Sequence, residues 1–454
     1  MKRKPFGLAL LSAAALGAVL FASCKKENHA QEGRAVTATQ VPPSSPILSG
    51  VLGTTHNVAD TILLTSGTVW HLSGLVYVDS ADVLIIQPGT VIKGDLSGSS
   101  TVAGGGLIIT KGAKILAQGT AANPIVFTSN SSTPQSGDWS GVVLLGKAPT
   151  NAPTTTRVEG VPDVSPADAT FGGNVPNDNS GILQFVRIEY AGFALSLNNE
   201  LNGLTLAGVG SGTVIDYVEV FKANDDAFEF FGGTVNASHL LAIDALDDMF
   251  DTDNGYIGTI SYALGLSDTT RADQSESNGF ESDNNAGGTG ATPITRPTYN
   301  YVTIVGLPNA TKAANGAGGF KYGRAAHLRR NAEFNLKNSI FVGFSTGISL
   351  DQTVGTTYDK YVSGVSVFTN NFVHGYVRSY AKEVSKVFTV IGTPTGNFGT
   401  TTLTNISLTS PFDRSGGAAS FFAAEGTPED QAGAFPNGAD WTTVGGSHNW
   451  TRYN

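Results

Sequence analysis

Short apolar runs, separated by glycine and small polar residues, fill the chain from Ile47 onward. Residues 84–92 and 107–115 are two such runs, 23 residues apart, and Gly89 of the first aligns with Gly112 of the second. A glycine at such a place suits a turn between two short strands that needs a left-handed or crowded backbone. No apolar stripe of helical period follows Ile47, so the pattern predicts many short strands and argues against a doubly wound α/β fold.

A second repeat lies between residues 217 and 285. Copies starting at Tyr217 and His239, 22 residues apart, align Phe228 with Phe250 and Glu229 with Asp251. A third copy, NGFESDNN at residues 278–285, adds a further Phe and Glu at the same places. A period of about 20–25 residues with one short strand per copy is typical of a solenoid in which each copy is one coil.

Stacked coils of a β-solenoid lie about 4.8 Å apart, so equivalent acidic side chains would form a column along one face. We call this set the acidic ladder. Its nine members are Asp225, Asp226, Glu229, Asp247, Asp248, Asp251, Asp253, Glu281 and Asp283. The sequence predicts that function resides there.

Composition narrows the classes of partner. The formal net charge of −10 argues against a nucleic-acid partner, which would need basic patches. A single cysteine, Cys24, excludes an intramolecular disulfide. Oligomeric state is left open by the sequence.

Residues 1–24 are expected to be a targeting segment rather than part of the fold. A basic start, MKRK, precedes a short apolar run that ends in Phe21-Ala22-Ser23-Cys24. This ending resembles the lipobox of bacterial lipoproteins, in which the cysteine is lipidated, although Phe21 stands where leucine is usual. The residues after Cys24 resemble those of lipoproteins sent to the outer membrane, so the sequence predicts a membrane anchor there.

The rest of the chain divides into three expected parts. Residues 25–46 are polar and read as a flexible tether, and residues 47–414 carry the solenoid pattern. Within the solenoid, residues 149–179 lose the repeat and are expected to form an inserted loop. Residues 415–454 contain Phe435, Trp441 and Trp450 and are expected to cover the last open rung as a cap.

Several motifs together resemble one family. They are IQPGTVIKG, GDWSGVVLLGKAP, NGLTLAGVGSGT, DDAFEFFGGTVN, DDMFDTDNG, NGFESDN, AAHLRRN and a tail with GAF, DWT and a final Trp. They resemble lipoproteins of Bacteroidota-type bacteria that are similar to right-handed parallel β-helix proteins. The resemblance implies an all-β, right-handed, single-stranded parallel β-helix of pectate-lyase-like architecture, and it transfers no reaction.

Three functions remain open for the acidic ladder. In the first, a glycan binds along the face through Glu229, Asp251, Asp253, Glu281 and Asp283. Ca²⁺ would be held by Asp247, Asp248, Asp251 and Asp253, since crowded carboxylates repel one another unless a cation or protons intervene.

In the second, the protein is a polysaccharide hydrolase or lyase. A hydrolase would pair Asp225 or Asp226 with Asp247 or Asp248 as acid and base. A lyase would need a base, and the candidates are Lys321, Arg324 and His327. This assumes that Gly319-Phe320 continues the column of Gly279-Phe280.

In the third, the protein is an adhesin or scaffold without small-molecule chemistry. The acids would then be corner residues that bond backbone N–H groups, with Phe228, Phe250 and Phe280 stacked inside. The first of the three functions is the one we favour.

Overall fold

The computed structural model describes residues 39–40, 46–53, 58–97, 104–161, 169–196, 199–314 and 321–453. The expected targeting segment with Cys24 and nearly all of the expected tether lie outside these residues.

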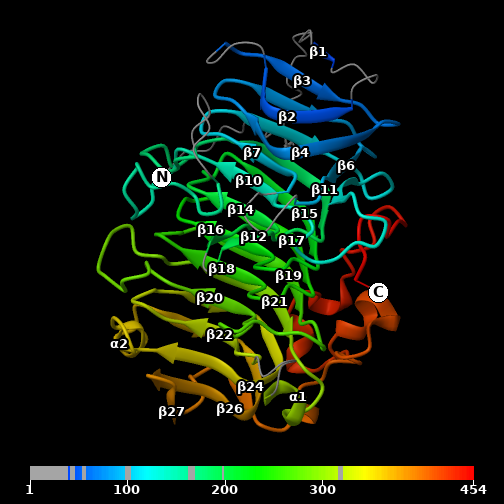
Figure 1. Ribbon diagram of the computed structural model, residues 1–454. Helices are drawn as coiled ribbons and strands as arrows, with labels where there is room; N and C mark the ends of the chain where they lie inside the picture. Colours follow the sequence, from blue (N-terminus) through cyan, green and yellow to red (C-terminus); the bar gives the residue numbers. More distant parts are fainter. Residues whose placement is uncertain are drawn as a thin grey trace, which may run out of the picture. The chain divides into compact units, whose positions relative to one another are not determined.

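Strands make up most of the regular structure in the described chain, and helices are few and short (Figure 1). In the first half the strands are β1 (Thr39–Gln40), β2 (Ile47–Leu52), β3 (Thr61–Leu64), β4 (Val69–Val78), β5 (Val83–Ile86), β6 (Val91–Gly94), β7 (Gly106–Ile109), β8 (Lys114–Gln118), β9 (Ile125–Ser129), β10 (Gly141–Leu145), β11 (Gly181–Glu189), β12 (Ala194–Ser196), β13 (Asn199–Glu200), β14 (Leu204–Ala207), β15 (Val214–Phe221) and β16 (Phe228–Phe231).

The second half continues with β17 (Ala237–Ile243), β18 (Phe250–Asp253), β19 (Thr259–Leu266), β20 (Phe280–Ser282), β21 (Thr298–Val305), β22 (Arg324–Leu328), β23 (Asn335–Lys337), β24 (Ile340–Asp351), β25 (Val367–Thr369), β26 (Phe372–Val384), β27 (Val387–Val390) and β28 (Phe398–Thr400). Among the described residues the helices are two α-helices, α1 (Ala310–Ala314) and α2 (Thr357–Val362), and four 3-10 helices, η2 (Leu403–Asn405), η3 (Arg414–Phe421), η4 (Pro428–Gln431) and η5 (Pro436–Gly438).

Nearly all strands pair in parallel with their equivalents in the next coil, which makes the solenoid unit a right-handed parallel β-helix, as expected. Figure 1 shows the stacked strands running from the blue to the orange end of the chain. One face positions the acidic ladder. Its strands follow one another in the order β7, β10, β14, β16, β18, β20, β22 and β24.

Alternation along these strands sends apolar side chains inward and polar ones outward. Phe228, Phe250 and Phe280 are fully buried and stack in the interior, with ring centroids 5.4 and 5.3 Å apart. The sequence alignment of these three positions is therefore confirmed, and the phenylalanines form core rather than an exposed platform.

The alignment of residues 84–92 with 107–115 is wrong. Leu84 pairs with Ile115, whereas Leu107 pairs with Val76, so Leu84 and Leu107, which the alignment made equivalent, lie on different faces of the helix. Strands on every face of the helix turn apolar side chains toward the shared core, so strands from different faces can have similar sequences. Both turn glycines do have a positive φ, of 81° at Gly89 and 99° at Gly112.

The described part of the insertion at residues 149–179 packs against the outside of the helix. Val158, Val161 and Phe171 are buried against Val143 and Leu145 of β10. The insertion thus covers an apolar patch on the face that carries the ladder, before the ladder begins.

The aromatic tail lies along a side of the helix rather than over its last rung, so the expected position of the cap is wrong. Figure 1 shows the red C-terminal segment beside the strands. Its Trp441 and Trp450 meet Tyr217 edge-on, at centroid distances of 6.5 and 5.5 Å. Arg452 forms an ion pair with Glu189 at 2.8 Å, and Ser447 donates to the carbonyl of Ala121.

A stack of outward aromatic rings explains this position. Phe185, Tyr217, His239, Tyr262 and Tyr301 all have positive φ at one corner of successive coils and stack at 4.3–5.4 Å. Such an apolar stripe is costly to expose, and the tryptophans of the tail cover it. None of the helices in the described residues is both long enough and apolar enough to span a membrane.

Candidate functional site

The acidic ladder has the register that the repeat predicts. Glu229 pairs with Asp251, and Asp251 pairs with Glu281. The next residue in this column is His327, which pairs with Glu281. The outward column of one face therefore changes from acidic to basic at β22.

Two of the acids are corner residues. Asp226 accepts the backbone N–H of Asp248 at 2.8 Å, and Asp248 accepts that of Asn278 at 2.6 Å. Asn278 continues the series by accepting the N–H of Arg324 through its Oδ1 at 2.8 Å. Burial, reinforced by neighbouring carboxylates, raises the pKa of Asp226 and of Asp248 well above the usual range. Their bonds to the backbone make these acids parts of the turns and poor candidates for acid and base.

The acids of the upper coils, Asp226 included, lie close to one another. One oxygen from each of Asp225, Asp226 and Asp247 lies within 4.8 Å of the others, and the same holds for Asp226, Glu229 and Asp251. Burial, followed by the charge of Asp273, raises the pKa of Asp247 to about 8. Burial also raises the pKa of Glu229, which accepts a bond from Asn202.

Asp251 stands at the centre of these groups. It shares a third cluster with Asp248 and Glu281, again within 4.8 Å. Its Oδ1 is buried and has no hydrogen-bond partner among the described residues. Burial, together with the charges of Glu281 and Asp283, raises its pKa well above the usual range. A buried carboxylate oxygen without a donor is costly unless a proton or a cation is present.

Six ladder acids have no basic ion-pair partner in the described part of the chain. No Lys, Arg or His of the described residues forms an ion pair with Asp226, Glu229, Asp247, Asp248, Asp251 or Asp253. This part of the face is therefore a concentration of carboxyl groups that no ion pair neutralises.

The lower end of the ladder is neutralised by arginines. Arg329 bonds both Glu281 and Asp283, and Arg330 bonds Asp283 at 2.7 Å. Although burial acts to raise it, Arg329 and His327 lower the pKa of Glu281 to about 2. Asp253 has no such bond, and burial with the charge of Asp283 raises its pKa to about 7.

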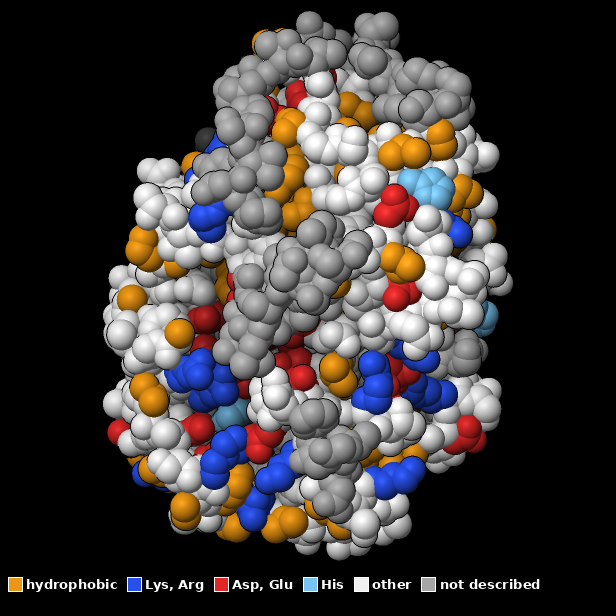
Figure 2. Space-filling model, in the orientation of Figure 1, with side chains coloured by type: hydrophobic (Ala, Val, Ile, Leu, Met, Phe, Trp, Pro, Cys, Tyr) orange, Lys and Arg blue, Asp and Glu red, His pale blue; other side chains and the backbone are white. Residues whose placement is uncertain are grey.

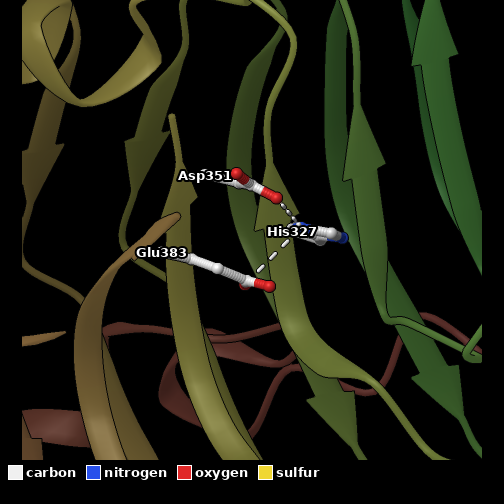
Figure 3. Close-up of side chains that lie close together, drawn as sticks. All are labelled: His327, Asp351 and Glu383. Atoms are coloured by element: carbon white, nitrogen blue, oxygen red, sulfur yellow. Dashed lines mark hydrogen bonds and ion pairs between the residues drawn. The ribbon is translucent and has the colours of Figure 1, made fainter. Parts of the chain in front are cut away.

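His327 lies among three carboxylates. Its Nδ1 is 3.5 Å from Glu281, and its Nε2 is 3.2 Å from Asp351 and 3.7 Å from Glu383. Figure 3 shows Asp351 and Glu383 pointing toward the imidazole from neighbouring strands. Burial acts to raise the pKa of Asp351, but bonds from His327 and Thr353 outweigh it and lower that pKa to about 2.

The candidate bases are placed differently from the expectation. Ala326, not Phe320, pairs with Phe280, so the assumed continuation of the column is wrong and Phe320 lies outside the described residues. Arg324 is 3 % exposed and bonded to Glu383 and Glu276, which makes it a poor base. Lys321 is exposed and does not touch the ladder, so of the three bases only His327 belongs to it.

Sequence reasoning missed Glu276, Asp351 and Glu383. Their coils contain long connections, and no repeat marks them in the sequence. One feature of the sequence could have predicted these acids. Residues 324–330 contain arginines and a histidine, which require acidic partners if they are buried.

The surface over this region is hollowed. His327, Arg329, Arg330, Asp351 and Lys386 take part in lining a cavity of about 440 Å³. In Figure 2, acidic side chains appear in the middle of the face, with Lys and Arg groups beside and below them.

Comparison with known families agrees with this fold. The family model for a pectate-lyase-like β-helix domain matches residues 55–411. No curated protein and no solved structure matches the chain.

Proposed function

Because the chain belongs to the pectate-lyase-like β-helix family, we propose that its acidic face binds an extended glycan with the help of Ca²⁺. The bound ion would lie among the carboxylates around Asp251. The observation that carries the proposal is the buried Oδ1 of Asp251, which has no partner among the described residues and is surrounded by other carboxylates.

The spacing of the acids supports a bound cation. Ca²⁺ takes oxygen ligands at about 2.3–2.6 Å, so two oxygens on one ion lie at most about 5 Å apart. The oxygens of Asp248, Asp251 and Glu281 lie within 4.8 Å of one another. A calcium ion has about six to eight ligands, so three side chains leave positions for oxygens of a second molecule. Sugar hydroxyl and carboxyl groups supply such oxygens.

The shape of the face supports an extended ligand. Equivalent groups recur at every coil along β16, β18, β20 and β22, and a cavity of about 440 Å³ adjoins the lower end. A chain-like ligand can therefore contact acidic and basic positions in sequence.

Calcium binding is the first test. Titration of Ca²⁺ into the EDTA-treated full chain in detergent is expected to give stoichiometric heat and a raised melting temperature. Asp251→Asn is expected to weaken binding about tenfold or more, because it removes one charged ligand. Glu333→Gln is the matched control, since Glu333 pairs with Lys360 outside the ladder. An absence of heat in the wild type contradicts the calcium site.

One observation favours a hydrolase or lyase as a second candidate. Asp251 and Glu281 are neighbours, yet burial raises the pKa of the first and Arg329 with His327 lowers that of the second to about 2. Neighbouring carboxyls with separated pKa values are typical of an acid and base pair. Of the pairs first expected, Asp225 or Asp226 with Asp247 or Asp248, the pair Asp226 with Asp248 is less suitable because both carboxylates hold backbone N–H groups.

A polysaccharide screen separates the two candidates. Binding without product, lost on EDTA treatment, is expected for a glycan-binding protein. Turnover that falls on the order of 100-fold in Asp251→Asn, with calcium binding retained at high Ca²⁺, identifies an enzyme. If the protein neither binds nor cleaves any polysaccharide, the remaining function is that of an adhesin or scaffold with a protein partner.

We place this function at the cell envelope, held by a lipid on Cys24. The support is the lipobox-like ending Phe21-Ala22-Ser23-Cys24 and the residues that follow it. The intact mass of membrane-extracted protein tests it: a chain that begins at Cys24 without a lipid would contradict the anchor.

A further inference from the structure

A second cavity lies near the last coils, apart from the acidic ladder. It has a volume of about 390 Å³ and is bordered by α1, β22, β24, β26 and β27. Four cationic side chains line it, Lys321, Arg324, Arg378 and Lys386, against one carboxylate, Glu276. Its volume is within the usual range of small-molecule sites.

The register of the strands builds this site. Arg324 pairs with Thr346, and Thr346 pairs with Arg378, so the two arginines lie two rungs apart in one column. Both guanidinium groups lie over the ring of Phe388, at 5.3 Å for Arg324 and 4.3 Å for Arg378. Two positive groups are thus held near one another, at a Coulombic cost.

Arg324 does not need a further anion. It bonds Glu383 and Glu276, and the attraction of these carboxylates raises its pKa even though burial opposes it. Lys386 also forms an ion pair with Glu276.

Arg378 lacks such a partner. Its Nη1 donates to Thr346 Oγ1 at 2.8 Å, and no described carboxylate forms a salt bridge with it. Burial, together with the charge of Arg324, outweighs the attraction of Glu383 and lowers its pKa. The guanidinium has five N–H donors, most of which this contact leaves unused. A stacked, partly buried and unpaired guanidinium is typical of oxyanion sites.

We propose that this cavity binds a tetrahedral oxyanion, sulfate or phosphate, through Arg378. Lys321 and the ring-stacked Arg324 add positive charge, and Phe388 holds both guanidinium groups in place. The anion forms charge-assisted hydrogen bonds that neutralise the excess positive charge of the cavity. This site is separate from the calcium site, since none of its cationic residues is a proposed calcium ligand, and Lys386 borders both this cavity and the one beside the ladder.

The test uses the full chain in detergent, with sodium sulfate, sodium phosphate or sodium acetate replacing sodium chloride at constant ionic strength. Sulfate, phosphate or both are expected to raise the melting temperature along a saturable curve, and the stronger of the two identifies the preferred ion. Arg378→Gln is expected to weaken that binding about tenfold or more, as loss of a charge-assisted bond predicts. Arg378→Lys keeps the charge but loses the planar fork, and it is expected to be intermediate.

Arg296→Gln is the matched control. Arg296 lies outside the cavity and pairs with Glu333, and its loss changes the net charge equally. Lys321→Gln, at an exposed position, is a second variant expected to fold and to bind more weakly than wild type. The proposal is overturned if no anion binds saturably, if acetate binds as well as sulfate and phosphate, or if Arg296→Gln weakens binding as much as Arg378→Gln.

Discussion

Replacing Arg324 by methionine is expected to lower the free energy of unfolding by about 3–5 kcal/mol, the usual cost of removing one partner from a buried ion pair. Arg324 is 3 % exposed, and Glu383, its partner through Nη2 and Nε, is fully buried. Without the guanidinium, Glu383 keeps a bond from Ser349, its contact with His327 and the weaker attraction of Arg378. The loss is therefore mainly the cost of a buried carboxylate left without its bonded counter-ion.

Denaturant unfolding at pH 7, followed by circular dichroism, measures this effect. The double variant Arg324→Met with Glu383→Gln removes the orphaned charge and is expected to regain part of the stability. Arg296→Met is the control, because its ion pair with Glu333 at 3.8 Å is exposed and worth little. A loss below 1 kcal/mol in Arg324→Met would show that Glu383 is not held as a buried charge.

The calcium-free protein is expected to lose stability as pH rises from about 4 to about 8. Burial raises the pKa of Asp247 to about 8 and that of Asp253 to about 7. Between the ordinary Asp value, about 3.9, and these values, the folded state binds more protons than the unfolded state. Linkage then requires the free energy of unfolding to fall over this window.

At low pH, the free energy of unfolding changes with pH in the opposite direction. The pKa values of Glu281 and Asp351 are lowered to about 2, so their contribution to stability is lost as pH falls below the ordinary values. The stability maximum of the calcium-free chain is therefore expected near pH 4–5. The loss up to pH 8 is expected to amount to several kcal/mol, because each pKa unit corresponds to about 1.4 kcal/mol before solvent screening reduces it.

Melting curves in EDTA at pH 4 to 9 measure this profile. Asp251→Asn is expected to flatten it between pH 5 and 8, because it removes a carboxylate whose charge raises the pKa of Asp226, Glu229 and Asp248. Glu333→Gln serves as the control. For the wild-type protein at pH 8, saturating Ca²⁺ is expected to restore the stability that is lost in EDTA. A profile that rises steadily to pH 8 in EDTA would contradict the burial of these charges.

The sequence by itself determined the solenoid and the register of its most regular part. Phe228 and Phe250 recur with Glu229 and Asp251 at a spacing of 22 residues because no long insertion separates these two positions, which therefore stack directly. The third copy, Phe280 with Glu281, follows a longer connection and is recognised by its residue types. Inward and outward faces follow from strand alternation, so a buried aromatic column beside an outward acidic column is a local property of the chain.

Only the tertiary structure decided which acids are corner residues and which groups meet. Asp226 and Asp248 bond the backbone while Asp251 does not, a difference set by turn geometry that is absent from the residue types. Coils of unequal length bring together His327, Asp351, Glu383 and Arg324, so the register of these residues cannot be counted along the sequence.

The aromatic tail was identified in the sequence, but its place beside Tyr217 and His239 depends on an aromatic stack formed only after the coils are wound. Spacing along the chain fixes neighbours only where each coil has the same length, and elsewhere packing decides them.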